Sequence, residues 1–134
     1  MKPELTAHQR LLLQAIVEPA SVLAYTNADW ELLLRLARQS SLLGLLAIEL
    51  EDRELIARIP ARAASQLRSC LAEIGNLQRQ VHWELNRIVW ALGAAEIPII
   101  ALKGAAYMLA GLPLSRGRDF GDLDVLVPKQ RIDE

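Results

Sequence analysis

An apolar stripe at helical spacing runs without interruption through residues 63–92. Its members are separated alternately by four and three residues, and only the fourth is polar: Leu67, Leu71, Ile74, Gln78, Val81, Leu85, Ile88 and Leu92. Because residues at this spacing share one face of an α-helix, the pattern predicts a single helix of roughly 45 Å. We expect this face to pack on the helices that precede it. A self-associating coiled coil, and hence a homo-oligomer, is the alternative.

Three shorter helices are predicted before the long one. Apolar residues recur at helical spacing in residues 11–16, 30–38 and 42–50. Pro19 is expected to end the first helix, and Asn27 or Asp29 to cap the second. No stretch before residue 94 alternates as a half-buried strand does. The first 93 residues are therefore predicted to form a helical N-terminal unit.

The composition excludes several classes of protein. Apolar residues make up 52% of the 134 residues and charged residues 23%, which excludes a disordered or collagen-like chain. The net charge of −1 argues against general binding of duplex nucleic acid, although a local basic site stays open. No window approaches about 18 continuous apolar residues, so no membrane span is predicted. Cys70 is the only cysteine, which excludes an intrachain disulfide, and we expect a cytoplasmic protein.

Four side chains that often mark binding sites are interpreted otherwise here. His8 and His82 each lack a second ligand three or four residues away, so neither is interpreted as metal-binding. Trp83 and Trp90 lie seven residues apart on a face beside the stripe, and we interpret them as core or interface residues.

The pattern changes from helical to mixed after residue 93. The apolar run 97–102 is rich in β-branched residues and predicts a buried strand that ends in a tight turn at Lys103 and Gly104. Residues 105–110 are typical of a short helix, which Gly111 closes.

A second strand is predicted at residues 122–127, where Pro128 ends it, and residues 129–134 are expected to begin another helix. The predicted fold class is therefore α+β and mostly α. A helical bundle is followed by the start of a mixed sheet, in the order strand, turn, helix, strand.

Two carboxylates lie on the second predicted strand. Side chains two residues apart on a strand point to the same face, with Cα atoms about 6.5–7 Å apart, so Asp122 and Asp124 can converge on one cation. Leu123, Val125 and Val127 would then face the core. A hard cation such as Mg²⁺, which prefers oxygen ligands, would compensate the two charges. The alternative is that both carboxylates are solvated at the open end of the strand.

The turn at Lys103 and Gly104 lies about twenty residues upstream of this pair. A glycine permits close approach of the backbone, the start of a helix offers free N–H groups, and the lysine adds a point charge. The combination suggests a site for a metal and a nucleotide. Arg116 and Arg118, in the loop between, either contact phosphate oxygens or are simply solvated.

Residues 97–127 resemble the signature of the nucleotidyltransferase-fold proteins of the DNA polymerase beta type. They are most similar to a bacterial group often labelled uncharacterised nucleotidyltransferases, which read approximately L-K-G-A-A, a short helix, and then R-x-x-x-D-[IL]-D-[LV]-L-V. Two blocks of this sequence match: Lys103, Gly104 and Ala105 in the first, and Arg118, Asp122, Asp124, Leu126 and Val127 in the second. The resemblance extends to the upstream helices and covers nearly the whole chain.

The resemblance implies an Mg²⁺-dependent enzyme that moves a nucleoside monophosphate from an NTP such as ATP to an acceptor and releases pyrophosphate. It implies that Asp122 and Asp124 are catalytic residues that hold the metal, and that Gly104 and the adjacent backbone seat the β- and γ-phosphates. The implied nucleotide-binding residues are Lys103, Gly104, Ala105 and Arg118. No residue identifies the acceptor or the base.

The sequence departs from the wider superfamily at two points. Many active members of the superfamily have glycine or serine after the first glycine of the phosphate turn, whereas Ala105 follows Gly104 here and supplies no hydroxyl. The fold normally adds a third carboxylate from a later strand, and the sequence ends at Glu134 before any such strand. We therefore expect residues 94–134 to be an incomplete catalytic core and the chain to be an inactive fragment of a longer enzyme. The alternative is a non-catalytic helical module, or pseudoenzyme, that binds a nucleotide or a partner.

Overall fold

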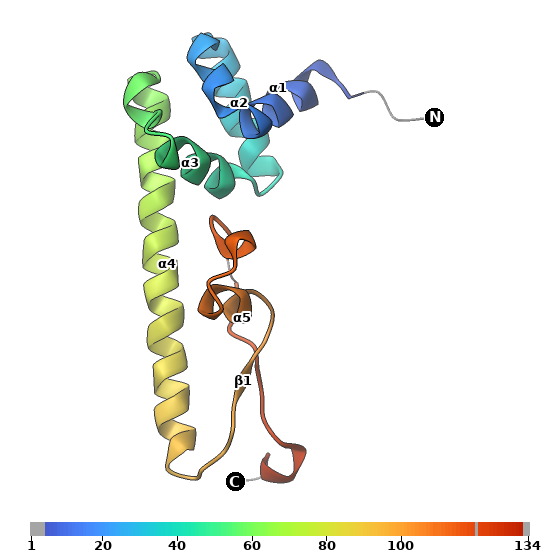
Figure 1. The fold of residues 1–134 in the computed structure, drawn as a ribbon, viewed down its shortest axis with the longest axis vertical. Helices are drawn as coiled ribbons and strands as arrows, with labels where there is room; N and C mark the ends of the chain where they lie inside the picture. Colours follow the sequence, from blue (N-terminus) through green and yellow to red (C-terminus); the bar gives the residue numbers. More distant parts are fainter. Residues whose placement is uncertain (1–4, 120, 133–134) are drawn as a thin grey trace. The chain divides into compact units, whose positions relative to one another are not determined.

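One long helix, α4 (Ala61–Gly93), contains the whole apolar stripe and confirms the helix predicted there (Figure 1). The computed structural model describes residues 5–119 and 121–132. Within it the chain divides into two units, residues 1–73 and 74–134, and the division falls inside α4. The boundary predicted after residue 93 stays a prediction.

Threonines begin the first two helices of the first unit. Thr6 caps α1 (Ala7–Val17) and Thr26 caps α2 (Asn27–Gln39), each in a reciprocal capping box. The backbone N–H of Asp29 donates to Thr26 Oγ1 (3.2 Å), and the backbone N–H of Thr26 donates to the Asp29 carboxylate (2.8 Å). The predicted N-cap at Asn27 or Asp29 is therefore wrong, because both residues already lie inside the helix.

Pro19 ends the first helix as predicted, and a second proline lies at the start of α4. α1 stops at Val17, and Pro19 begins a short 3₁₀ helix, η1 (Pro19–Ala24). After α3 (Leu43–Asp52) and a second 3₁₀ helix, η2 (Ile56–Arg58), Pro60 directly precedes α4. The proline ring fixes φ and removes an N–H donor, which favours these breaks.

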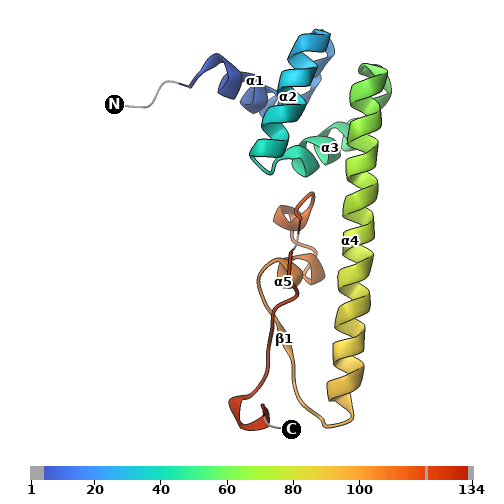
Figure 2. The same cartoon turned by 180° about the vertical axis from the view of Figure 1, so that it is seen from behind.

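The core of the first unit lies where α1, α2 and α3 gather at the N-terminal end of α4 (Figures 1 and 2). Its largest fully buried side chains are Val22, Leu33, Leu46, Leu50 and Leu67. Leu71 packs against this core from the next turn of the stripe, so the predicted packing on the preceding helices is confirmed for these first two stripe positions. The stripe positions from Ile74 onward belong to the second unit.

The two tryptophans beside the stripe are exposed. Trp83 is 58% exposed and Trp90 is 84% exposed, so the interpretation as core residues is wrong. The guanidinium of Arg87 lies over the Trp83 ring, 4.7 Å from its centroid. Val81, a stripe position close by, is only 6% exposed, so the stripe is the covered face of this segment and the tryptophans lie outside it.

The second unit contains a two-stranded antiparallel sheet within the described residues. β1 (Ile100–Ala101), labelled in Figure 2, pairs with β2 (Val125–Leu126). The register is Ile100↔Leu126 and Ala101↔Val125. Helix α5 (Lys103–Leu109) follows β1 directly. The predicted order of strand, turn, helix and strand is confirmed, and with it the α+β class.

Both strands are shorter than the runs 97–102 and 122–127 that were predicted. Continuing the register outward places Pro98 opposite Pro128. Neither proline has an N–H to donate, so the ladder cannot extend in that direction. In the other direction the chain leaves the ladder at Lys103, where α5 begins. Asp122 and Asp124 therefore both lie before β2 rather than on it, and the prediction that they share a strand is wrong.

Two 3₁₀ helices complete the second unit, η3 (Pro113–Ser115) and η4 (Lys129–Arg131). The helix expected at residues 129–134 is only this 3₁₀ turn as far as Ile132, and residues 133 and 134 lie outside the described part. In the part of the chain that the structure describes, no helix has both the length and the apolar character needed to cross a bilayer.

Candidate functional site

The antiparallel ladder brings the turn after β1 next to the residues before β2. One step beyond the paired residues, the backbone N–H of Leu102 donates to the carbonyl oxygen of Asp124 (2.9 Å). Lys103 comes next in the chain, and its Nζ lies 2.7 Å from Asp124 Oδ2. The lysine of the first sequence motif and a carboxylate of the second, which lie far apart in the sequence, thus form one ion pair.

The charges around Lys103 raise the pKa of its ammonium above the ordinary value of 10.5. The hydrogen bond to Asp124 is the largest cause, the charge of Asp124 the next, and partial burial opposes both. Asp122 adds a smaller effect of the same sign. Both predicted metal ligands therefore act on the same cation, although Lys103 and Asp124 are exposed to solvent over 76% and 40% of their side chains.

The left-handed residue of the turn is Lys103 and not Gly104. Lys103 has φ of +53°, a conformation that is uncommon outside glycine, asparagine and aspartate. Gly104 has no such φ, so the conformational freedom of a glycine is not what shapes this turn. Ala105, the third residue of the first motif, is 1% exposed, and its methyl group is packed inside the unit. The first N–H groups of any α-helix have no acceptor within the helix, and this holds for the start of α5.

Two arginines, Arg116 and Arg118, lie in the loop between the two motifs. Arg118 is exposed, and its backbone N–H donates to the carbonyl oxygen of Ser115 (3.4 Å). Among the described residues, no hydrogen bond or ion pair joins its guanidinium to Asp122 or Asp124. Arg116 is also exposed. The structure therefore brings together Lys103 and Asp124, with Asp122 close enough to influence the lysine, and leaves Arg118 outside this group.

The donor set suits a hard divalent cation in part. The two carboxylates of Asp122 and Asp124 offer oxygen ligands. The Lys103 ammonium already contacts Asp124 Oδ2, so this oxygen is accessible to a cation. Residues 5–119 and 121–132 contain no cluster of three or more histidine, cysteine, aspartate or glutamate side chains suited to a metal ion. We expect the third carboxylate of the fold to come from a later strand. That expectation stays a prediction, because Glu134 lies outside the described residues.

Two residues that the sequence did not single out support this part of the fold. Ser115, buried to 5% exposure, donates from Oγ to the carbonyl oxygen of Leu112 (2.7 Å) and holds the loop after α5. Arg131 donates from Nη2 to the carbonyl oxygen of Ala95 (2.8 Å) and ties η4 to the turn after α4. The Arg131 contact has no local sequence signal, because it joins residues 36 positions apart that only the fold brings together.

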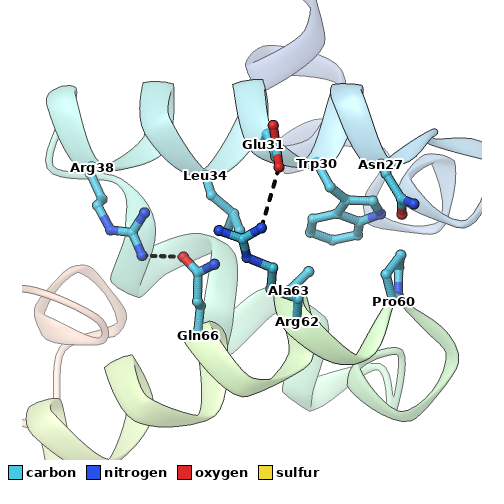
Figure 3. A pocket seen from close by; sticks show the side chains of 9 residues that line it. All are labelled: Asn27, Trp30, Glu31, Leu34, Arg38, Pro60, Arg62, Ala63 and Gln66. Atoms are coloured by element: carbon cyan, nitrogen blue, oxygen red, sulfur yellow. Dashed lines mark hydrogen bonds and ion pairs between the residues drawn. The ribbon is translucent and has the colours of Figure 1, made fainter.

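A separate cavity of about 350 Å³ lies in the first unit, between α2 and the start of α4 (Figure 3). Arg62 pairs with Glu31 (3.5 Å) and Arg38 donates to Gln66 across it. The buried indole Nε1 of Trp30 has no hydrogen-bond partner in the described part. The residues that line the cavity are Asn27, Trp30, Glu31, Leu34, Arg38, Pro60, Arg62, Ala63 and Gln66.

Comparison with protein-family models identifies a family that this chain matches. A family model described as "uncharacterised nucleotidyltransferase" matches residues 26–134, which include both motifs and the ion pair between them. Comparison with curated proteins gave no match, and comparison with solved structures gave none either.

Proposed function

Since the chain belongs to the uncharacterised nucleotidyltransferase family, we propose that it serves Mg²⁺-dependent transfer of a nucleoside monophosphate from an NTP to an acceptor. The observation that carries this proposal is the contact between Lys103 Nζ and Asp124 Oδ2 at 2.7 Å. It supports the proposal because it joins a residue suited to phosphate with a residue suited to a metal, and the substrate of such a reaction is a metal-bound triphosphate.

The proposed roles follow the chemistry of each side chain. Asp122 and Asp124 hold the metal through carboxylate oxygens, and Lys103, at the start of α5, offers a mobile positive charge to phosphate oxygens. Gly104 and Ala105 contribute backbone N–H groups, and Arg118 reaches the nucleotide from the loop. When bound, Mg²⁺ neutralises charge on the triphosphate oxygens. The acceptor is a molecule of unassigned class.

Removing both carboxylates tests the metal site. The variant Asp122→Asn, Asp124→Asn keeps the size of each side chain but removes two negative charges, so we expect it to lose at least tenfold in affinity for Mg²⁺-ATP. Calorimetric titration of the protein, as its gene encodes it, with ATP in the presence and absence of Mg²⁺ measures this. The parent protein is expected to bind only with Mg²⁺.

A matched control removes two charges elsewhere. Glu51 and Glu73 are exposed residues of the first unit, and the variant Glu51→Gln, Glu73→Gln should bind Mg²⁺-ATP like the parent. Equal affinity of the parent and the Asp122→Asn, Asp124→Asn variant would contradict the proposed metal ligands.

A pseudoenzyme is the second candidate, and Ala105 favours it. The residue has a buried methyl group at the position where active relatives of this fold are expected to have glycine or a hydroxyl. A module that binds a partner through its helices would show no Mg²⁺-dependent binding of ATP, so the same calorimetric titration separates it from the enzyme. A pseudoenzyme that still binds the nucleotide would bind Mg²⁺-ATP but release no pyrophosphate from it, and an assay of pyrophosphate release separates that form.

A further inference from the structure

We propose that Lys103 is a displaceable counter-ion, which neutralises Asp124 while no metal is bound and leaves it when a divalent cation binds there. The proposal rests on the proposed function, because it takes Asp122 and Asp124 as the metal ligands. It adds that Lys103 weakens binding of the metal alone and strengthens binding of the metal with its nucleotide.

The backbone holds the lysine opposite the carboxylate. Leu102 and Asp124 are joined by a backbone hydrogen bond of 2.9 Å, so the residues on either side of this contact are fixed relative to each other. The left-handed φ of +53° at Lys103 turns the chain into α5 at this point. The side chain of Lys103 thus starts beside Asp124 and reaches Oδ2 without any movement of the backbone.

The ammonium of Lys103 contacts the same carboxylate oxygen that a metal cation would bind. Its Nζ contacts Oδ2 of Asp124 and also feels the charge of Asp122, so one positive charge partly neutralises two negative ones. A divalent cation held by the same carboxylates would repel an ammonium that stayed in place, because like charges a few ångströms apart destabilise each other. The two cations therefore compete for Asp124.

The exposure of the ion pair makes displacement easy. Lys103 is exposed over 76% of its side chain and Asp124 over 40%, and exposed ion pairs contribute little to stability. The lysine side chain is a flexible four-carbon stem, so its ammonium can move from Asp124 to another anion while its backbone stays in the turn. A triphosphate beside the metal would supply that anion.

Manganese titration without nucleotide tests the first half of the proposal. Free Mn²⁺ is measured by electron paramagnetic resonance, with Mn²⁺ as the probe for the divalent site. Lys103→Gln removes the competing charge and should bind Mn²⁺ about twofold to fivefold more tightly than the parent, the range that corresponds to an exposed ion pair. Lys103→Arg keeps the charge and should bind like the parent. Lys129→Gln, which removes an exposed lysine of the same unit, is the matched control and should also bind like the parent.

Titration of ATP at saturating Mn²⁺ tests the second half. Here Lys103→Gln should bind about tenfold more weakly, because a charged hydrogen bond to phosphate is lost. The opposite signs of the two effects identify a counter-ion that moves. A residue with a purely structural role would weaken both titrations or neither, and either of those results overturns the proposal.

The Asp122→Asn, Asp124→Asn variant separates this proposal from the proposed function. If the parent binds Mn²⁺ and this variant does not, the metal ligands are supported, and an unchanged or weaker Mn²⁺ affinity of Lys103→Gln then overturns the counter-ion alone. If the parent binds no Mn²⁺, or if the Asp variant binds it equally well, the proposed function fails and the counter-ion fails with it.

Discussion

Lys103 combines an unfavourable backbone conformation with a favourable charge contact. A left-handed φ costs a residue with a Cβ atom about 1–2 kcal/mol relative to glycine, and Lys103 has φ of +53°. Its ion pair with Asp124 is exposed and offsets little of that cost. A strained residue that carries a charge into a candidate site is a common feature of functional positions.

Glycine and alanine at position 103 should therefore differ in stability. Both variants lose the ammonium, and only glycine adopts this φ without strain, so we expect Lys103→Gly to be about 1 kcal/mol more stable than Lys103→Ala. Ala106, in the interior of α5, serves as the control, because glycine should be the less stable residue there. Ala106→Gly should lower the free energy of unfolding by about 0.5–1 kcal/mol. Denaturant unfolding measures all three, and equal stability of the two variants at position 103 would show that the turn is not strained.

Helix α2 depends on the capping box at its start. Thr26 satisfies the backbone N–H of Asp29, and Ala in its place leaves that donor without its partner. We expect Thr26→Ala to lower the free energy of unfolding by about 1 kcal/mol. Ser65→Ala, an exposed position inside α4, removes a hydroxyl that caps no helix and should leave stability unchanged or slightly higher. Thermal and urea unfolding compare the two variants, and equal losses would contradict a capping role.

The same capping box predicts a pH dependence. The Thr26 hydroxyl donates to the Asp29 carboxylate (2.7 Å), and this hydrogen bond, together with that of the Thr26 backbone, lowers the pKa of Asp29 below its ordinary value of 3.8. A carboxyl with a lowered pKa in the folded state stabilises the fold above its ordinary pKa, and that contribution is lost as the pH falls through about 4 and below. The difference in unfolding midpoint between the parent and Asp29→Asn should therefore shrink as the pH is lowered from 6 to 3. A constant difference would rule out this linkage.

The sequence predicted those features of the elements that depend on local pattern. Four- and three-residue spacing was sufficient for α4, because a regular apolar face needs no information from elsewhere in the chain. Pro19 ended α1 for an equally local reason. The lengths of β1 and β2 were not predictable, because Pro98 limits the ladder only when the register places it opposite Pro128.

The sequence identified the residues of the candidate site but did not predict which of them are in contact. Asp124 and Lys103 each stood out by residue type and spacing, yet their contact depends on the register of the sheet. The left-handed φ of Lys103 was not predicted, because a lysine carries no sequence signal for this conformation. The exposure of Trp90 could not be read from helical spacing, which shows which residues share a face but not which face is covered.

On the scale of the whole molecule, the first unit should behave as one cooperative unit, so that truncating a central leucine of its core destabilises all of its helices together. Leu50 is fully buried, and Leu50→Ala should lower stability by about 2–5 kcal/mol. Leu13, which is 48% exposed, is the matched control, and Leu13→Ala should have a much smaller effect.

Amide hydrogen exchange distinguishes the response of the two units. Leu50→Ala should speed exchange throughout α2 and α3, while the N–H of Leu102, bonded to Asp124 in the second unit, keeps the rate of the parent. An equal acceleration at Leu102 would mean that the chain unfolds in a single cooperative step, with no independent second unit.

The placement of the three tryptophans offers an optical means of following these units. Trp30 is buried in the core of the first unit, whereas Trp83 and Trp90 are exposed in the second. A buried indole fluoresces at shorter wavelength than one in contact with water. With Trp83 and Trp90 replaced by phenylalanine, the emission of Trp30 alone would therefore report on the first unit, and its red shift would time the loss of that core independently of the rest of the chain.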